Sequence, residues 1–127
     1  MIHGVGIDIV DVKRIEQATG RWGERFLKKV FTDAEISYCY TRFAPYNSLA
    51  VRFAGKEAFV KAFQTGEAIS LRDIEILVDG KTGKPAVILH GATKQAFKSN
   101  IKKGIIHVSL SHDGGSAIAS VIIEDNQ

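Results

Sequence analysis

Hydrophobic and polar positions follow two different periods along this chain, and the two periods separate strands from helices. Five short runs rich in β-branched residues predict strands, because apolar residues that alternate or cluster over four to eight positions are typical of half-buried or buried strands. These runs are residues 2–10, 74–78, 86–90, 105–112 and 117–124. A glycine-containing segment at 79–85 predicts a tight turn between 74–78 and 86–90. Another at 113–115 predicts a turn between 105–112 and 117–124.

Longer runs with a helical period predict four helical regions. Val12, Ile15, Ala18 and Trp22 form one apolar face, interrupted near Gly20 and Gly23. Thr32 and Glu35 have capping-box spacing, which predicts a helix that begins at Asp33 and ends before Pro45. The strongest helical pattern covers 48–63, with Gly66 as its left-handed cap, and a short helix is expected over 92–98. Strands and helices mixed without regular alternation favour the α+β class.

Composition and cysteine content limit the setting of the protein. The 127 residues are 45% hydrophobic and 24% charged, which fits one globular domain over residues 1–127. Cys39 is the only cysteine, so no intrachain disulfide can form and a reducing, cytoplasmic compartment is expected. The chain has no leader pattern and no apolar run of the roughly 18 residues that a membrane span needs, so no membrane association is expected.

The distribution of charge is more informative than its sum. A formal charge of +3 is too small to imply nucleic acid. Between Lys13 and Lys29, however, six basic residues face only two acidic ones. This local positive field suits an acidic partner, although a solvated helix face explains the same pattern.

Two carboxylates are difficult to explain as ordinary surface residues. Asp8 stands near the end of the first strand, and Glu57 lies inside a largely apolar helix. Buried carboxylates need a cation, and two hard oxygen ligands suit Mg²⁺. Lys56 and Lys61, with Arg52 one turn earlier, could offset a polyanion such as a diphosphate. Simpler explanations remain: an ion pair between Glu57 and Lys61 four residues apart, a turn hydrogen bond for Asp8, and aliphatic packing of the lysines.

Other candidate motifs carry less chemistry. His107 and His112 bracket a strand whose His107, Ser109 and Ser111 share one side, but no nucleophile elbow or orienting aspartate accompanies them. The glycine and lysine turn at 80–84 lacks the Gly-Lys-Ser/Thr ending of a P-loop. Neither pattern predicts a catalytic triad or a nucleotide loop.

Four segments in order resemble the holo-acyl-carrier-protein synthase branch of the phosphopantetheinyl transferases. They are residues 6–10 (GIDIV), 52–62 (RFAGKEAFVKA), 83–85 (GKP) and 107–112 (HVSLSH). The resemblance spans essentially the whole chain, with Gly55 where the family often has alanine. It implies an antiparallel sheet packed on a long central helix, and a homotrimer with an active site at each subunit interface.

The same resemblance implies a reaction and a set of residues. The serine of an apo acyl carrier protein would attack the β-phosphorus of coenzyme A and release 3′,5′-ADP, in support of fatty acid biosynthesis. Asp8 and Glu57 match positions that hold Mg²⁺, and Lys61 matches a phosphate-contacting lysine. The segments around the nucleotide contain Arg52, Lys56, Lys84, Pro85 and His107. The positions that dock the carrier protein match Arg14, Arg21, Arg25, Phe26 and Lys29.

Several alternatives stay open at this point. The serine proton could pass to Glu57 or to a metal-bound water. A non-catalytic module could bind nucleotide or RNA through its basic segment, with a steep salt dependence and no need for Mg²⁺. A metal-dependent phosphohydrolase would release product from coenzyme A without any carrier protein.

Overall fold

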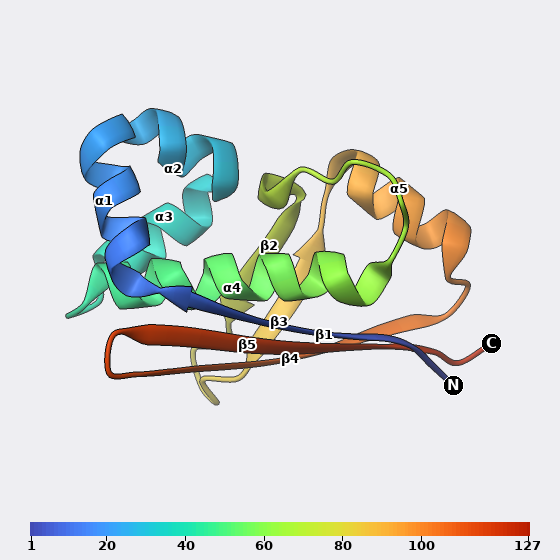
Figure 1. Ribbon diagram of the computed structural model, residues 1–127. Coiled ribbons are helices and arrows are strands. Elements are labelled where there is room, and N and C mark those ends of the chain that lie inside the picture. The colour runs from blue at the N-terminus through green and yellow to red at the C-terminus, as the bar shows by residue number, and fades with distance from the viewer.

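The computed structural model describes residues 1–127 as an α+β fold, as the sequence predicts (Figure 1). The strands are β1 (Ile2–Asp11), β2 (Ile74–Val78), β3 (Pro85–Leu89), β4 (Gly104–Asp113) and β5 (Ser116–Asp125). The helices are α1 (Val12–Trp22), α2 (Glu24–Val30), α3 (Asp33–Tyr40), α4 (Pro45–Phe63) and α5 (Gly91–Asn100), with a 3₁₀ turn at Leu71–Asp73. None of the helices has the length and hydropathy that a bilayer crossing requires.

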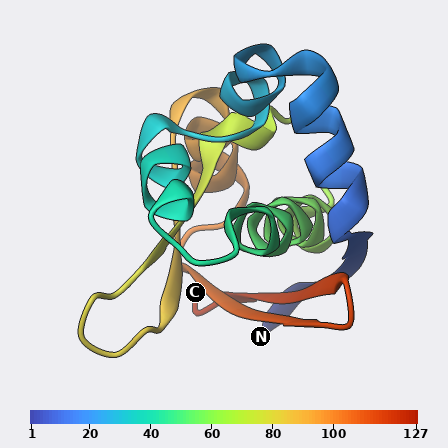
Figure 2. The same ribbon diagram turned by 90° about the vertical axis from the view of Figure 1, so that its left-hand side faces the viewer.

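An antiparallel sheet in the order β1-β5-β4 lies against one side of α4, which is seen end-on above the sheet in Figure 2 (compare Figure 1). The hairpin of β2 and β3 forms a separate two-stranded sheet. In Figure 1, α1, α2 and α3 gather at one end of α4 and α5 covers the other end. The antiparallel sheet packed on a long central helix, implied by the resemblance, is therefore confirmed.

Strand β1 and helix α4 approach each other closely because small residues face each other across their contact. A Cβ atom on Gly4 would lie 1.9 Å from the carbonyl oxygen of Ala62, and one on Gly6 would lie 1.9 Å from that of Ala58. Any side chain at these two positions would force the strand away from the helix. The glycines therefore fix the distance between the two elements that carry Asp8 and Glu57.

Helix α4 is enclosed on nearly all sides. Leu49, Ala50, Val51 and Arg52, a complete helical turn, are all buried, and Ala54, Gly55 and Lys56 repeat the pattern one turn later. At the far end, Phe59 and Phe63 pack with Phe97 of α5, with ring centroids 5.5 to 6.1 Å apart. This central helix therefore anchors most of the core.

The ends of the helices agree with the sequence in part. The Thr32 and Glu35 capping box forms at α3 as predicted, and Asp11 caps α1 by accepting from the Lys13 amide. Helix α4 begins at Pro45, three residues earlier than predicted, because proline is well suited to the first helical turn. Its left-handed cap is Gln64, with φ 55°, and not Gly66.

The face of the sheet turned away from α4 is uncovered in the single chain. Along β1, Val5, Ile7 and Ile9 have exposed fractions of 58, 63 and 64%, and Ile118 of the neighbouring β5 is also exposed. The alternate residues of β5, among them Ala119 and Val121, are buried against α4. Exposed apolar stripes of this kind are typical of surfaces that contact another protein.

Candidate active site

Asp8 lies on the face of β1 that is turned toward α4, two positions beyond Gly6. Its side chain is 17% exposed, and Lys61 Nζ donates to Asp8 Oδ1 at 3.1 Å and to the Ile7 carbonyl oxygen at 2.9 Å. The ion pair between Lys61 and Glu57, the simpler explanation that helix spacing offers, is not formed, because Lys61 reaches across to β1 instead. The lysine thus joins the central helix to the strand that carries the first carboxylate.

Glu57 belongs to the same cluster. Burial raises the pKa of its carboxyl, and the negative charge of Asp8 raises the pKa further, while Lys61 acts in the opposite direction. Glu57 and Lys61 stand four residues apart on α4, and Lys61 contacts Asp8, so the two carboxylates lie on the same side of this helix. The structure therefore brings Asp8 together with Glu57 and Lys61, which lie 49 and 53 residues further along the chain.

The donor set of this cluster fits Mg²⁺. The structure contains no group of three or more histidine, cysteine or acidic side chains that could enclose a metal ion. Mg²⁺ does not require such a cage, because it typically takes one or two carboxylates and completes its shell with water and phosphate oxygens. The negative charge of Asp8 contributes to the raised pKa of Glu57. A divalent cation between the two carboxylates would offset this repulsion and stabilise both in their charged form.

Lys56 and Arg52 lie elsewhere, inside the fold. Lys56 is fully buried, and its three donors go to Glu35 Oε1 at 2.8 Å, to the Leu71 carbonyl oxygen at 3.0 Å and to the Ile74 carbonyl oxygen. No donor is left for a nucleotide, so the expectation that Lys56 contacts one does not fit this fold. The reason is that its helix position faces α3 and β2, which the sequence pattern did not reveal.

Arg52 is 3% exposed and is held beneath Tyr38, with its guanidinium carbon 4.9 Å from the ring centroid. Its Nε donates to the Ile76 carbonyl oxygen, and its Nη1 donates to Ser48. Only Nη2 has no partner, although it is buried. A phosphate contact for Arg52 therefore stays a prediction that depends on this single nitrogen.

The other predicted nucleotide residues lie together at the opposite edge of the sheet. Lys84, Pro85 and His107 line a hollow of about 570 Å³ between the turn after β2 and strand β4. The His107 ring is hydrogen-bonded to Glu124 of β5. The order β1-β5-β4 places this hollow and Asp8 at opposite edges, and His107 alternates onto the face that α4 does not cover. One chain alone does not join the two parts of the predicted site.

The predicted carrier-protein surface is solvent-accessible. Arg14, Arg21, Arg25 and Lys29 are exposed and Phe26 is partly buried. Arg25, Phe26 and Lys29 line a hollow of about 370 Å³ together with Trp22. Trp22, whose helical spacing predicted a core position, is 52% exposed, and Arg21 lies over its ring at 4.9 Å. Its side chain stays exposed because α1 ends at Trp22 and no other element covers the ring, which the helical spacing does not reveal.

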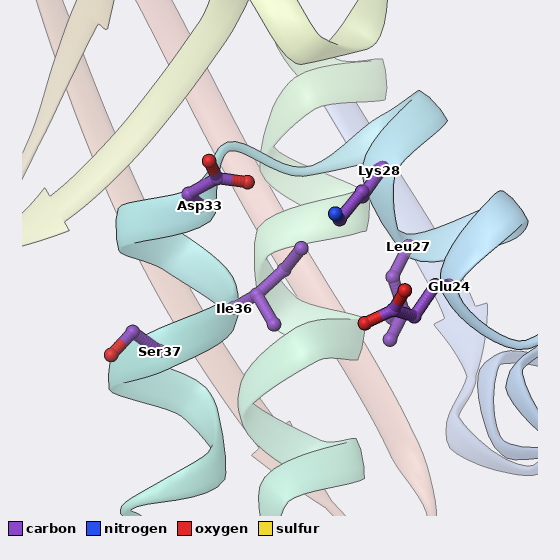
Figure 3. Close-up of a pocket in the computed structure, with 6 residues that line it drawn as sticks. All are labelled: Glu24, Leu27, Lys28, Asp33, Ile36 and Ser37. Carbon is purple, nitrogen blue, oxygen red and sulfur yellow. The ribbon is translucent and has the colours of Figure 1, made fainter.

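A smaller hollow of about 230 Å³ separates α2 from α3 (Figure 3). Figure 3 shows its lining residues, with Glu24, Leu27 and Lys28 on α2 and Asp33, Ile36 and Ser37 on α3. Its charges nearly balance, and none of the predicted site residues lines it. It therefore adds nothing to the predicted site.

Comparisons with known proteins agree with this geometry. The sequence model described as the 4′-phosphopantetheinyl transferase superfamily matches residues 4–120, so the chain belongs to this superfamily. The holo-[acyl-carrier-protein] synthase of Halothermothrix orenii is 48% identical over 127 residues, which cover 98% of this chain and 99% of that protein. The resemblance seen in the sequence is thereby confirmed.

Solved structures of similar proteins share the whole fold. The holo-[acyl-carrier-protein] synthase of Neisseria meningitidis superposes with a TM-score of 0.88 at 34% identity, over 98% of this chain and 99% of that one. A synthase complex with coenzyme A, from Chronobacterium ammoniagenes, gives a TM-score of 0.85 at 29% identity over 98% of each chain. The architecture is therefore common to the family along its full length.

Proposed function

We propose that this chain is a one-domain, Mg²⁺-dependent transferase that moves 4′-phosphopantetheine from coenzyme A to a serine of an apo acyl carrier protein. The products are the holo carrier protein and 3′,5′-ADP. The observation that carries the proposal is the cluster of Asp8, Glu57 and Lys61 in a chain of this superfamily. Similar proteins bear the name holo-[acyl-carrier-protein] synthase, and one of their structures holds coenzyme A.

Each residue of the cluster has a separate part in this reaction. Asp8 and Glu57 would hold the ion, and Lys61 would contact the diphosphate as a second cation. When bound, Mg²⁺ offsets the charge of the diphosphate and of the leaving oxygen. The serine hydroxyl attacks the β-phosphorus, the bond from that phosphorus to the 3′,5′-ADP oxygen breaks, and the serine proton passes to Glu57 or to water.

The complete site would form between copies of this chain. Asp8 and the hollow at Lys84, Pro85 and His107 lie at opposite edges of one sheet, so a ligand that needs both requires a second copy. The exposed stripe of Val5, Ile7, Ile9 and Ile118 offers the apolar surface for this association. A homotrimer is the assembly that we propose. Ile118→Glu should reduce the molecular mass of the assembly measured by light scattering. Ile88→Glu, at an exposed position of β3, should leave this mass unchanged.

The setting of the reaction follows from its partners. An acidic carrier protein would dock on Arg14, Arg21, Arg25, Phe26 and Lys29, and modification of this carrier would support fatty acid biosynthesis. A cytoplasmic location is part of the proposal, since Cys39, the only cysteine, is a free thiol and forms no disulfide.

The central experiment incubates the purified chain with coenzyme A, Mg²⁺ and an apo acyl carrier protein, followed by intact-mass measurement. The carrier should gain the mass of one phosphopantetheine group, and omission of Mg²⁺ or addition of a chelator should prevent the gain. Release of 3′,5′-ADP without any carrier protein would favour a phosphohydrolase instead. Tight RNA binding without transfer would favour a nucleic-acid-binding module.

A further inference from the structure

The buried ion pair between Lys56 and Glu35 has no part in the reaction described above. Both side chains are 0% exposed, and Lys56 Nζ lies 2.8 Å from Glu35 Oε1. A buried ion pair contributes little net stability, because the cost of removing both charges from water offsets their attraction. Lys56 directly precedes Glu57 in α4, which suggests that the pair contributes to the geometry of the site and not to stability.

The ammonium of Lys56 is fixed in direction. Its three acceptors come from three separate segments: α3, the 3₁₀ turn and the first residue of β2. Glu35 is equally constrained, since Oε1 also accepts from the Thr32 amide and Oε2 accepts from the Ile76 amide at 2.9 Å. All these contacts can form together at only one rotation of α4 about its axis.

Apolar packing restricts this rotation only in part, through the close contacts of α4 with β1 and with Ile76. Buried residues occupy every side of α4, and even its less buried stripe, which includes Glu57, also carries Phe53 and Val60. Hydrogen bonds depend on direction, so they add a constraint on the rotation of α4 that its apolar contacts do not supply.

We infer that Lys56 and Glu35 are a positioning pair that sets the rotation of α4 and thereby aims Glu57 at Asp8. Successive residues of a helix are about 100° apart, so fixing Lys56 toward α3 fixes Glu57 toward the β1 side. On that side, the contacts of Ala58 and Ala62 with Gly6 and Gly4 set the distance between α4 and β1, and the hydrogen bonds of Lys56 hold the rotation of α4 within this contact. This inference rests on the proposed role of Glu57 as a metal ligand.

The test compares Mn²⁺ affinity, measured in the presence of coenzyme A, between the full-length chain and Lys56→Met. Loss of a contact that orients a metal-ligating side chain typically weakens metal binding about 10- to 100-fold. We expect a loss of Mn²⁺ affinity of this size in Lys56→Met. Val51→Ala is the matched control, because Val51 is buried in the same helix but makes none of these polar contacts. Its affinity for Mn²⁺ should stay that of the unchanged chain.

Glu35→Gln provides a second variant. Its amide oxygen can still accept from Lys56, but its amide nitrogen meets the Ile76 N–H, so we expect a smaller loss of Mn²⁺ affinity than in Lys56→Met. Unchanged affinity in a folded Lys56→Met chain would overturn the inference. Failure of both variants to fold would also overturn it, since the pair would then serve folding itself.

The same measurements separate this inference from the proposed function. A wild-type chain that transfers phosphopantetheine and binds Mn²⁺, with Lys56→Met unchanged, would refute only the positioning pair. A wild-type chain that binds no Mn²⁺ would refute both the pair and the metal site. Wild-type Mn²⁺ binding without any transfer would refute the proposed function, while the variants would still decide whether the pair aims Glu57.

Discussion

Gly6 of β1 lies so close to Ala58 of α4 that a Cβ atom on Gly6 would stand 1.9 Å from the Ala58 carbonyl oxygen. Real Cβ atoms essentially never come this near to a backbone oxygen, so the strand and helix would have to separate. The same contact places Asp8, two residues further along the strand, beside the helix that carries Glu57 and Lys61. A contact between two backbones therefore sets the geometry of the candidate site.

Gly6→Ala should destabilise the protein by about 3–5 kcal/mol, the range of severe core disruptions. Urea unfolding measures this change. Gly20→Ala is the matched control, since Gly20 lies in α1 with open space around it. This second change should stabilise the chain by about 0.5–1 kcal/mol because alanine favours the helix. Equal stability of the two variants would contradict the close contact.

Gly55→Ala should show strong coupling to Ile76. The new methyl group would lie 2.4 Å from Ile76 Cδ1, and Ile76 is fully buried. Overpacking of about 1–3 kcal/mol exceeds the gain of about 1 kcal/mol in helix propensity, so the single variant should lose stability.

Ile76→Val removes this Cδ1 atom and supplies the second half of a double-mutant cycle. In the Ile76→Val background, Gly55→Ala should raise the free energy of unfolding by about 0.5–1 kcal/mol. The same effect of Gly55→Ala in both backgrounds would show that the two side chains do not compete for space.

Lys61→Met should lower kcat for phosphopantetheine transfer by roughly 10²-fold, as removal of one stabilising donor does in other active sites. Lys61 Nζ contacts Asp8 and the Ile7 carbonyl oxygen and is itself half exposed, so the fold should persist. Steady-state kinetics with circular dichroism as a check on folding measure the effect. Lys94→Met in exposed α5 should retain full activity.

Glu75 should make the protein sensitive to acid. Burial raises the pKa of its carboxyl, but hydrogen bonds from Thr32 Oγ1 and His90 outweigh this effect and hold the pKa below the ordinary value of 4.5. A carboxyl with a depressed pKa adds stability above its unfolded-state pKa, and this stability is lost as pH falls toward the folded-state pKa.

Urea titrations between neutral pH and pH values below 4.5 test this dependence. Glu75→Gln should flatten the loss of stability on acidification, since the amide does not titrate. Exposed Glu67 is the control, and Glu67→Gln should leave the profile unchanged. An unaltered slope in Glu75→Gln would mean that the hydrogen bonds from Thr32 and His90 do not favour the charged carboxylate.

Trp22 and Arg25 should affect carrier-protein binding without affecting coenzyme A. Both line the hollow on α1 and α2, which lies on elements separate from the cluster of Asp8 and Glu57. Trp22→Ala and Arg25→Ala should raise KM for the carrier protein, and Arg25→Ala should also weaken its salt dependence. A rise in KM for coenzyme A instead would contradict the docking surface. Lys98→Ala, exposed on α5, is the matched control.

Much of the fold could be predicted because its patterns are local. The strand limits at 74–78, the interruption between α1 and α2 and the Thr32 capping box all depend on residues near one another in sequence. The boundaries of α4 were harder to predict from the sequence. Pro45 fits either a stop or a first helical turn, and Gln64 adopts a left-handed conformation that sequence statistics assign first to glycine.

The residues of the site divide in the same way. Asp8 and Glu57 stood out because acids are unusual in apolar segments, and the family resemblance added Lys61. Which partner Lys61 takes depends on β1, 53 residues away, and helix spacing alone favoured Glu57. Trp22 shares the apolar spacing of α1 but is exposed, and the nucleotide contact that the resemblance implied for Lys56 conflicts with its enclosure beside Glu35.

The sequence by itself determined the elements, their class and the family, since each of these follows from local periodicity, turn chemistry and ordered motifs. Only the tertiary structure decided that Gly6 meets the backbone of Ala58, that Lys56 is enclosed by Glu35, and that Asp8 is paired with Lys61. The physical reason is that burial and ion pairing depend on which distant segments come together, and one helix face can meet a strand, another helix or water with the same residues.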